Sequence, residues 1–294
     1  MYPVRVNNFY QLVEEMCVIA RVKNTNTIRS KQMYGNVRMV FLVAYKEKLN
    51  VSYRRFVQIC DENNIQRMLC IKRIPHFSTL QKFVQRTPKT IFETLVRACR
   101  KLLNLKNVVA SIDGTGFSNT NPSHYYQKRI DGIEVKNYTK TMFLTDNNTK
   151  LIMNVKTTSD HSHETNYFKP LVTEVASSLK MILADKGYDS KSNRDHCRKQ
   201  GIEVHIPPRK RTETRRQEKQ HSKNHKELEL FDKNKYDDRA IIEAINSAIK
   251  RTLGGYTNNK KQGNQQKQIT IKAFTYNVEK IGNDFHVNVE IITD

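Results

Sequence analysis

The sequence predicts an α/β fold with a mixed sheet flanked by helices, preceded by a helical region. Two patterns predict it. Up to residue 104, apolar side chains recur three and four positions apart, as in amphipathic helices. From residue 105, short β-branched runs alternate with helical segments. We therefore expect a helical domain at 1–104 that binds DNA. A catalytic domain is expected at 105–294, with a basic loop at 207–235 and a C-terminal helix and tail at 261–294.

The charge balance points to a polyanionic partner. Lys and Arg number 51 against 29 Asp and Glu, which gives a formal net charge of +22. Nucleic acid is the usual partner of such a surplus, whereas a merely basic protein is the plainer alternative and an anionic membrane a weaker one. No apolar run approaches the ~20 residues of a membrane span, so we expect a cytoplasmic protein. Five scattered cysteines without a C-x-x-C pair argue against a disulfide framework and a zinc ribbon.

The helical region contains five predicted helices, at 12–22, 37–49, 52–64, 77–87 and 90–103. Asn50, Ser78 and Thr90 stand at predicted N-cap positions. Residues 52–86 suit a helix-turn-helix, although any small helical bundle has the same periodicity. The exposed face of its recognition helix would carry Gln81, Lys82, Gln85 and Arg86.

The first strand of the α/β region is predicted at NVVASID, which ends in Asp113. Gly114, Thr115 and Gly116 follow, a composition that predicts a tight turn. Asp113 would then lie at the carboxyl end of a strand, where open α/β sheets usually bind ligands. The alternative is a turn aspartate that caps its own backbone.

A β-hairpin is predicted next, because DNNT separates the β-rich runs KNYTKTMFLT and KLIMNVKTTSD. The first run and the residues before it offer basic and aromatic side chains suited to phosphates, although solvated charges explain any one of them. These side chains are Lys128, Arg129, Lys136, Tyr138 and Lys140. His161 and His163 lack a third ligand at a suitable spacing, and turn or cap roles are favoured over metal binding.

A second acid ends a second apolar strand. After a helix within 165–178, MILADKGYDS places Asp185 directly behind a short strand. A helix closed by Gly201 and the strand IEVHIPP follow. A basic segment, RKRTETRRQEKQHSKNHK, then begins with Arg209, Lys210 and Arg211. Its position favours a DNA contact, with a solvated charge run as the alternative.

The segment YDDRAIIEAINSAIKR, residues 236–251, predicts one largely buried helix with a polar face. That face carries Tyr236, Arg239, Glu243, Asn246 and Lys250. Buried charges need partners of opposite sign, so this face indicates a site. An amphipathic helix with solvated charges is the alternative. Gly254 and Gly255 end the helix, and QITIKAFTYNVEKI predicts one more.

Three carboxylates on two strand ends and one helix face suit two-metal phosphoryl transfer. Asp113, Asp185 and Glu243 supply the hard oxygen ligands that Mg²⁺ prefers. Two such ions activate the attacking oxygen and neutralise the leaving one.

With these motifs the chain resembles the DDE transposases of prokaryotic insertion sequences, in the branch with a Y-x2-R-x3-E-x6-K signature. Tyr236, Arg239, Glu243 and Lys250 match that signature at every spacing. The segments around the family's two aspartates resemble SIDGTG and ADKGYDS. The hairpin between them resembles NYTKTMFLTDNNTKLIMNVKTTSDHSHET, and a motif of the N-terminal region resembles IPHFSTLQKFVQR. The resemblance therefore runs from residue 74 to 250. Glu164 departs from the aspartate frequent in relatives, and 185–243 is too short for the large β insertion that some carry.

The resemblance implies an RNase H-like core and a DNA transposase. Asp113, Asp185 and Glu243 would bind two Mg²⁺ or Mn²⁺ ions, water would cut the transposon end, and the freed 3′-hydroxyl would attack target DNA. Tyr236, Arg239 and Lys250 would lie on the DNA, and two copies would pair when the ends are synapsed. A metal-dependent nuclease without strand transfer and an inactive DNA-binding relative are the rival interpretations. The 236/239/243/250 face should point toward both aspartates.

Overall fold

The computed structural model divides into two compact units, each described here by itself. The helical unit comprises residues 1–103, 116–139 and 249–294, and the sheet unit 104–115 and 140–248. The residues that the structure describes are 6–25, 33–119, 138–159, 163–208 and 231–284.

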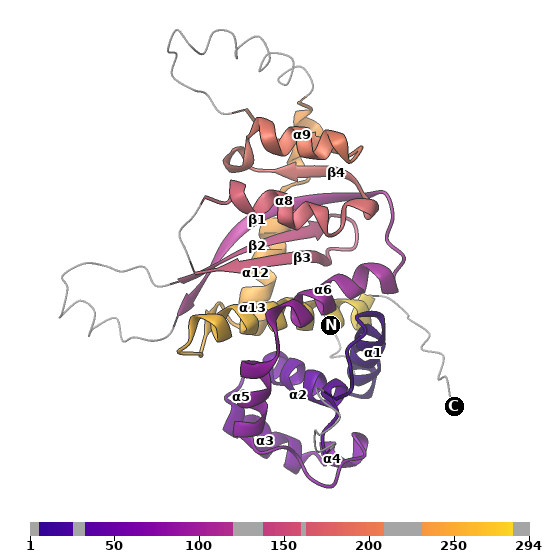
Figure 1. Cartoon of the computed structure of the whole chain (residues 1–294), viewed down its shortest axis with the longest axis vertical. Coiled ribbons are helices and arrows are strands. Elements are labelled where there is room, and N and C mark those ends of the chain that lie inside the picture. Colours follow the sequence, from indigo (N-terminus) through magenta and orange to yellow (C-terminus); the bar gives the residue numbers. More distant parts are fainter. Residues whose placement is uncertain (1–5, 26–32, 120–137, 160–162, 209–230, 285–294) are drawn as a thin grey trace, which may run out of the picture. The chain divides into compact units, whose positions relative to one another are not determined.

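The helical unit confirms the helices predicted for the N-terminal region (Figure 1). One short helix was not predicted, α4 at Ile65–Met68. The others are α1 (Val6–Ile19), α2 (Asn36–Leu49), α3 (Tyr53–Glu62), α5 (Phe77–Arg86), α6 (Lys89–Leu102) and the C-terminal α13 (Gln262–Asp284). On α5 the four predicted recognition side chains are exposed, whereas Leu80, Phe83 and Val84 are buried.

The predicted N-caps are wrong. Asn50 instead closes α2 in the left-handed conformation, with φ of 49°, and the cap of α3 is Ser52, whose hydroxyl accepts from the Arg55 N–H. Ser78 lies inside α5, because the ring of His76 already accepts the Ser78 N–H. Thr90 likewise lies inside α6, which begins one residue earlier.

The helix α13 packs against α6, α2 and α1, within the helical unit. The sequence placed this segment in the catalytic domain. It carries buried side chains around most of its circumference, including Ile269, Phe274 and Val278, so it needs helices on several sides. The domain boundaries stay a prediction, but α13 contributes to the core of the N-terminal helices.

The sheet has the strand order β3-β2-β1-β4-β5, and β6 pairs with β1. β1, β4 and β5 are parallel, whereas β2 and β3 form the predicted antiparallel hairpin. In the turn of this hairpin, the Asp146 carboxylate accepts the N–H groups of Asn148 and Thr149. The strands are β1 (Val108–Asn119), β2 (Tyr138–Asp146), β3 (Ile152–Thr158), β4 (Leu179–Ala184), β5 (Glu203–His205) and β6 (Tyr256–Thr257).

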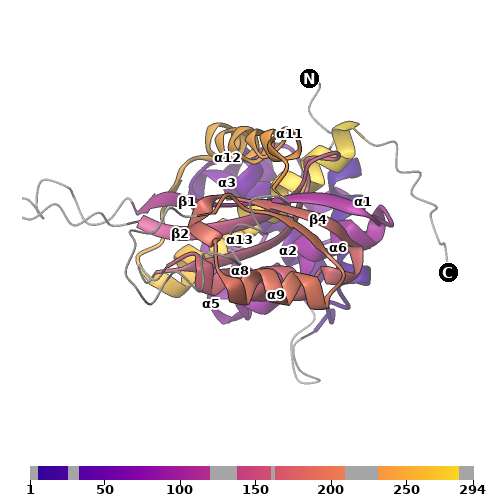
Figure 2. The ribbon, with the colours of Figure 1, turned by 90° about the horizontal axis from the view of Figure 1, so that it is seen from above.

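Helices flank this sheet on both sides. Figure 2 shows α8 and α9 on one side and α11 with α12 on the other. The core lies between the sheet and α8, where Ile112 and Ile182 meet Phe168 and Leu171. The helices are α8 (Thr165–Thr173), α9 (Lys191–Lys199), α11 (Lys233–Asp237), α12 (Ala240–Leu253) and the 3₁₀ turns η1 (Ala176–Ser178) and η2 (Lys186–Tyr188). The predicted α/β class, a mixed sheet flanked by helices and preceded by a helical region, is confirmed.

The cysteines and the hydropathy of the helices bear on two further expectations. All five cysteines are free, as expected; four are buried, and Cys70 is exposed. Within the described residues, no helix is both long enough and apolar enough to cross a membrane.

Candidate active site

Asp113 and Asp185 occupy equivalent positions on neighbouring parallel strands. The pairing of β1 with β4 runs to Ile112 opposite Ala184, and each aspartate is the next residue along its strand. Because parallel strands run in one direction, both aspartates lie at the same end of the paired strands. Asp185 ends β4 as predicted, and its Oδ1 accepts the Lys186 N–H at 2.7 Å.

β1 does not stop at Asp113, which corrects the prediction of a tight turn there. The strand continues through Gly114 and Gly116 to Asn119. A Cβ on Gly114 would lie 2.5 Å from Oε1 of Glu164. A Cβ on Gly116 would lie 3.0 Å from the ring of Tyr138. These glycines allow close approach of side chains to an extended strand, a role that composition alone does not distinguish from a turn.

The predicted helix 236–251 is also interrupted. Tyr236 belongs to α11, whereas Glu243 lies on α12, and Arg239 stands between the two helices. There the bonds run from Arg239 N–H to the Tyr236 carbonyl and from Ile242 N–H to the Arg239 carbonyl, a three-residue spacing. The helix is also less buried than predicted, since Ala240, Glu243 and Ala244 are exposed.

Arg239 links the acids of two elements. Its Nη1 lies 3.4 Å from Oδ1 of Asp113 and its Nη2 2.6 Å from Oε1 of Glu243. The guanidinium carbon lies 5.8 Å from the centre of the Tyr236 ring. The predicted polar face therefore points toward Asp113 in this part of the sheet unit.

Asn246 is the second contact from α12 to Asp113. Its Nδ2 donates to Oδ2 of Asp113 at 2.9 Å. The residue is 7% exposed, and its Oδ1 has no hydrogen-bond partner within the part of the chain that the structure describes. Both Asp113 oxygens therefore have partners on the 239–246 segment, while a buried amide oxygen beside them remains available.

Burial is the main influence on Asp113. It raises the pKa of this carboxyl from 3.8 to about 6, against the lowering effects of Arg239 and of the Gly114 N–H. The charges of Glu164 and Glu243 raise the pKa further. Like charges this close favour the protonated acid unless a cation intervenes.

Glu164 adds a fourth acid that the sequence did not select. It stands at the start of α8, pairs with Nζ of Lys140 at 3.2 Å and lies against Gly114. Beneath it, burial raises the pKa of the Tyr188 phenol well above its usual value, with further contributions from Glu164 and Asp113. Lys140, predicted to bind DNA, is thus already paired with an acid.

The donor set fits a hard divalent cation by its chemistry. Carboxylate oxygens and the unpartnered amide oxygen of Asn246 are the ligand types that Mg²⁺ and Mn²⁺ take. Among the described residues, however, no three His, Cys, Asp or Glu side chains gather closely enough to hold an ion. Arg239 lies between Asp113 and Glu243, and the Glu243 side chain is 60% exposed. An ion that bound both acids would compete with Arg239 for their oxygens.

The other predicted residues are dispersed. The Nζ of Lys250 lies 5.7 Å from the centre of the Phe117 ring, in the helical unit. The carbonyl of His163 accepts the Asn166 N–H, as suits the predicted turn role. Arg209, Lys210, Arg211 and His161, together with Lys128, Arg129 and Lys136, lie outside the described residues. The DNA contacts of all these basic residues stay predictions.

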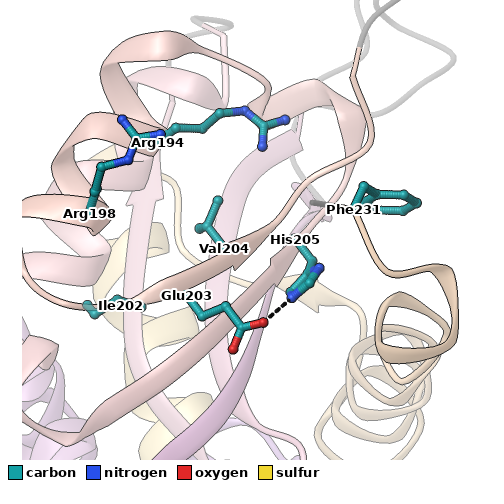
Figure 3. A pocket seen from close by; sticks show the side chains of 7 residues that line it. All are labelled: Arg194, Arg198, Ile202, Glu203, Val204, His205 and Phe231. Carbon is teal, nitrogen blue, oxygen red and sulfur yellow. Dashed lines mark hydrogen bonds and ion pairs between the residues drawn. The ribbon is translucent and has the colours of Figure 1, made fainter. Parts of the chain in front are cut away.

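A cavity of about 220 Å³ lies at the edge strand β5, and none of the three predicted acids lines it (Figure 3). His205 is bonded to Glu203 there at 2.7 Å. The ring of Phe231 stands 5.3 Å from that of Tyr236, which places the cavity next to α11. The lining residues are Arg194, Arg198, Ile202, Glu203, Val204, His205 and Phe231.

Asn246 and Glu164 are the site residues that sequence reasoning did not assign. Asn246 was on the predicted polar face, three residues after Glu243, so its position was a usable signal. Glu164 offered none, because its approach to Gly114 depends on how α8 packs behind the sheet.

Comparison with known proteins identifies the family. The family model of the transposase DDE domain matches residues 104–278. Among solved structures, a piggyBac transposase synaptic complex with hairpin DNA aligns at 13% identity and a TM-score of 0.37, covering 71% of this chain and 49% of that one. This chain thus spans about half the length of that transposase. No curated protein matches. Because the family model covers more than half of the sequence, the chain belongs to the family of the transposase DDE domain.

Proposed function

We propose that this protein is a DNA transposase that cleaves transposon ends and joins the 3′-hydroxyl to target DNA. One observation carries the proposal: Asp113 and Asp185 end the pairing of neighbouring parallel strands, and Arg239 connects Asp113 to Glu243. Membership of the DDE family supports it.

Asp113, Asp185 and Glu243 would hold two Mg²⁺ or Mn²⁺ ions. When bound, such ions supply activation of the attacking oxygen and charge neutralisation at the leaving oxygen. Asn246 keeps the Asp113 carboxylate in one orientation through the bond to Oδ2. The half-buried surroundings of Asp113 exclude part of the water that would otherwise weaken charge interactions there.

Double-stranded DNA is the proposed partner. The formal charge of +22 supplies general attraction to phosphates. Near the acids, Arg239 and Lys140 are proposed to contact the strand. Tyr236, Lys250 and the segment beginning Arg209, Lys210 and Arg211 are proposed as further DNA contacts. Two copies would act together on two ends, and cytoplasmic DNA is the proposed setting.

Strand joining is the decisive test. Purified protein is mixed with Mn²⁺ or Mg²⁺, a pre-nicked duplex copied from the DNA that borders the gene, and a target plasmid. Joined products should form with wild type and be lost in Asp113→Asn, Asp185→Asn and Glu243→Gln. Asp195→Asn is the matched control, because Asp195 pairs with Arg198 on the outer helix α9.

Each of the other outcomes would indicate a different function for this protein. Metal-dependent cleavage without joined products would indicate a nuclease. DNA binding with neither cleavage nor joining would indicate an inactive relative. Full activity in any one of the three variants would remove that acid from the site.

A further inference from the structure

Arg239 occupies the space between two acids that come from different parts of the chain. Asp113 lies on β1 and Glu243 on α12, yet the same guanidinium pairs with both. The side chains of Arg239 and Asp113 are 17% and 22% exposed, so this pair is shielded from water, whereas the Glu243 side chain is 60% exposed. Guanidinium remains protonated at any ordinary pH. The acids thus already have a resident cation.

A second pair repeats this arrangement beside the first. Nζ of Lys140, on β2, lies 3.2 Å from Oε1 of Glu164, which in turn lies against Gly114, the residue after Asp113. Arg239 and Lys140 are the two described basic residues of the sheet unit that we propose to contact DNA. Arg239 is paired with Asp113 and Glu243, and Lys140 is paired with Glu164 beside Gly114.

We propose that Arg239 and Lys140 act as placeholder cations, which the phosphates of bound DNA draw away so that divalent ions can bind the acids. The inference rests on the proposed function, and it adds an exchange of partners at the site. The acids would exchange their basic side-chain partners for metal ions, and the basic side chains would exchange the acids for DNA phosphates.

Arg239 and a divalent ion would compete for the same two acids. Mg²⁺ binds carboxylate oxygens at about 2.0–2.1 Å and Mn²⁺ prefers similar ligands, and Arg239 now contacts one oxygen of Asp113 and one of Glu243. Both oxygens of Asp113 are engaged, one by Arg239 and one by Asn246. The guanidinium and the ion would also repel each other at this distance.

Phosphate is a suitable competitor for these basic groups. The planar fork of an arginine matches the oxygens of a phosphate as well as those of a carboxylate. Leaving the acids without a cation is costly, because Asp113 is half-buried. Departure of Arg239 and arrival of a divalent ion are therefore coupled, and DNA should raise metal affinity. By linkage, metal should raise DNA affinity by the same factor.

The test measures Mn²⁺ binding directly, by electron paramagnetic resonance of free Mn²⁺, with and without a short duplex of mixed sequence. Without DNA, Arg239→Gln should bind Mn²⁺ about tenfold more tightly than wild type, within the range of typical coupling. Lys140→Gln should shift affinity in the same direction by less. Arg251→Gln, which removes an exposed charge from α12, the helix that follows Arg239, should match wild type.

DNA should strengthen Mn²⁺ binding more in wild type than in Arg239→Gln, because the variant has no placeholder to displace. A gain in Mn²⁺ affinity with DNA in wild type alone does not show the exchange, because a bound ion would also contact the DNA phosphate directly. The DNA-free affinity is the discriminating value. Arg239→Lys keeps the charge but lacks the fork, and should lie between the two. Thermal melts by circular dichroism establish that each variant is folded.

The failures are distinguishable. Equal or weaker Mn²⁺ binding by folded Arg239→Gln and Arg239→Lys without DNA overturns the exchange, while strand joining by wild type would leave the proposed function standing. No Mn²⁺ binding by wild type even with DNA overturns both. If Arg239→Gln does not fold, Arg239→Lys and Lys140→Gln decide by the same criterion.

Discussion

Each unit of this protein holds a cluster of charged and polar side chains, and the two clusters are built differently. In the helical unit, Glu47 is 2% exposed and accepts from Nζ of Lys46 at 2.9 Å and from Nε2 of Gln268 at 3.2 Å. Lys272 is 1% exposed and donates to the carbonyls of Gly254 and Tyr256. This structural cluster is closed to water and supplied with partners.

The candidate site in the sheet unit is left open. Glu243 is mostly exposed, Asn246 keeps an unpartnered oxygen, and Asp113 is partly desolvated among other acids. Buried charges with full partners hold elements together, whereas partly satisfied charges remain available to a ligand. Removing the charge of an acid should therefore lower stability in the structural cluster and raise it at the candidate site, which the first two of the following predictions test; the four predictions run from the largest effect to the smallest.

Glu47→Gln should be the most destabilising change, lowering the free energy of unfolding by about 3 kcal/mol. It removes the negative charge that opposes the effect of burial on Lys272, whose pKa is already lowered to about 8. Urea unfolding measures the change. Glu62→Gln is the control, because Glu62 pairs with Arg55 on the surface and should cost less than about 1 kcal/mol. A loss at Glu47 no larger than this control would contradict a structural role for the cluster.

Asp113→Asn should stabilise the metal-free protein at pH 7, by about 2 kcal/mol. The folded-state pKa is about 6 against 3.8 when unfolded, so the wild-type carboxyl favours folding below pH 3.8 and loses that contribution as pH rises toward 6. The difference in melting temperature between variant and wild type, in EDTA, should therefore grow between these values and then level off. A flat Asp113→Asn profile would contradict the desolvated site.

Asn246→Ala should reduce strand cleavage about tenfold, as expected when the partner that orients a metal-binding carboxylate is removed. It should also cost about 1 kcal/mol of stability through the lost bond to Asp113. Cleavage rates and urea unfolding are the measurements. Ser247→Ala, at the exposed neighbouring position, should leave both unchanged. An Asn246→Ala enzyme with wild-type rates would show that Asp113 needs no such support.

Gly114→Ala should have the smallest effect on stability, within about 0.5 kcal/mol. The new Cβ meets only the flexible end of Glu164, which can move away. Cleavage should nevertheless fall severalfold, because Glu164 is displaced from Asp113 and Lys140. Gly263→Ala meets no atom within 4 Å and is the control. Wild-type cleavage in Gly114→Ala would show that the position of Glu164 is unimportant.

Local chemistry determined much of this protein from the sequence. The Asp-Asn-Asn turn specified the hairpin because the Asp146 carboxylate accepts N–H groups of the turn itself. A short apolar run ending at Asp185 specified a strand end, and the 3.6-residue period specified the helices. The face that carries Arg239, Glu243 and Asn246 followed from the same period, and it points to Asp113 although α11 and α12 are separate helices.

Tertiary structure decided what depends on distant partners. β1 continues past Asp113 because its far end pairs with β6, formed by residues 256 and 257, and because Gly114 and Gly116 admit the side chains of Glu164 and Tyr138. The contact of Asn246 with Asp113 spans 133 residues, and the burial of Lys272 depends on a turn 18 residues away. Periodicity reports only which face of an element is polar, whereas long-range packing determines what that face meets.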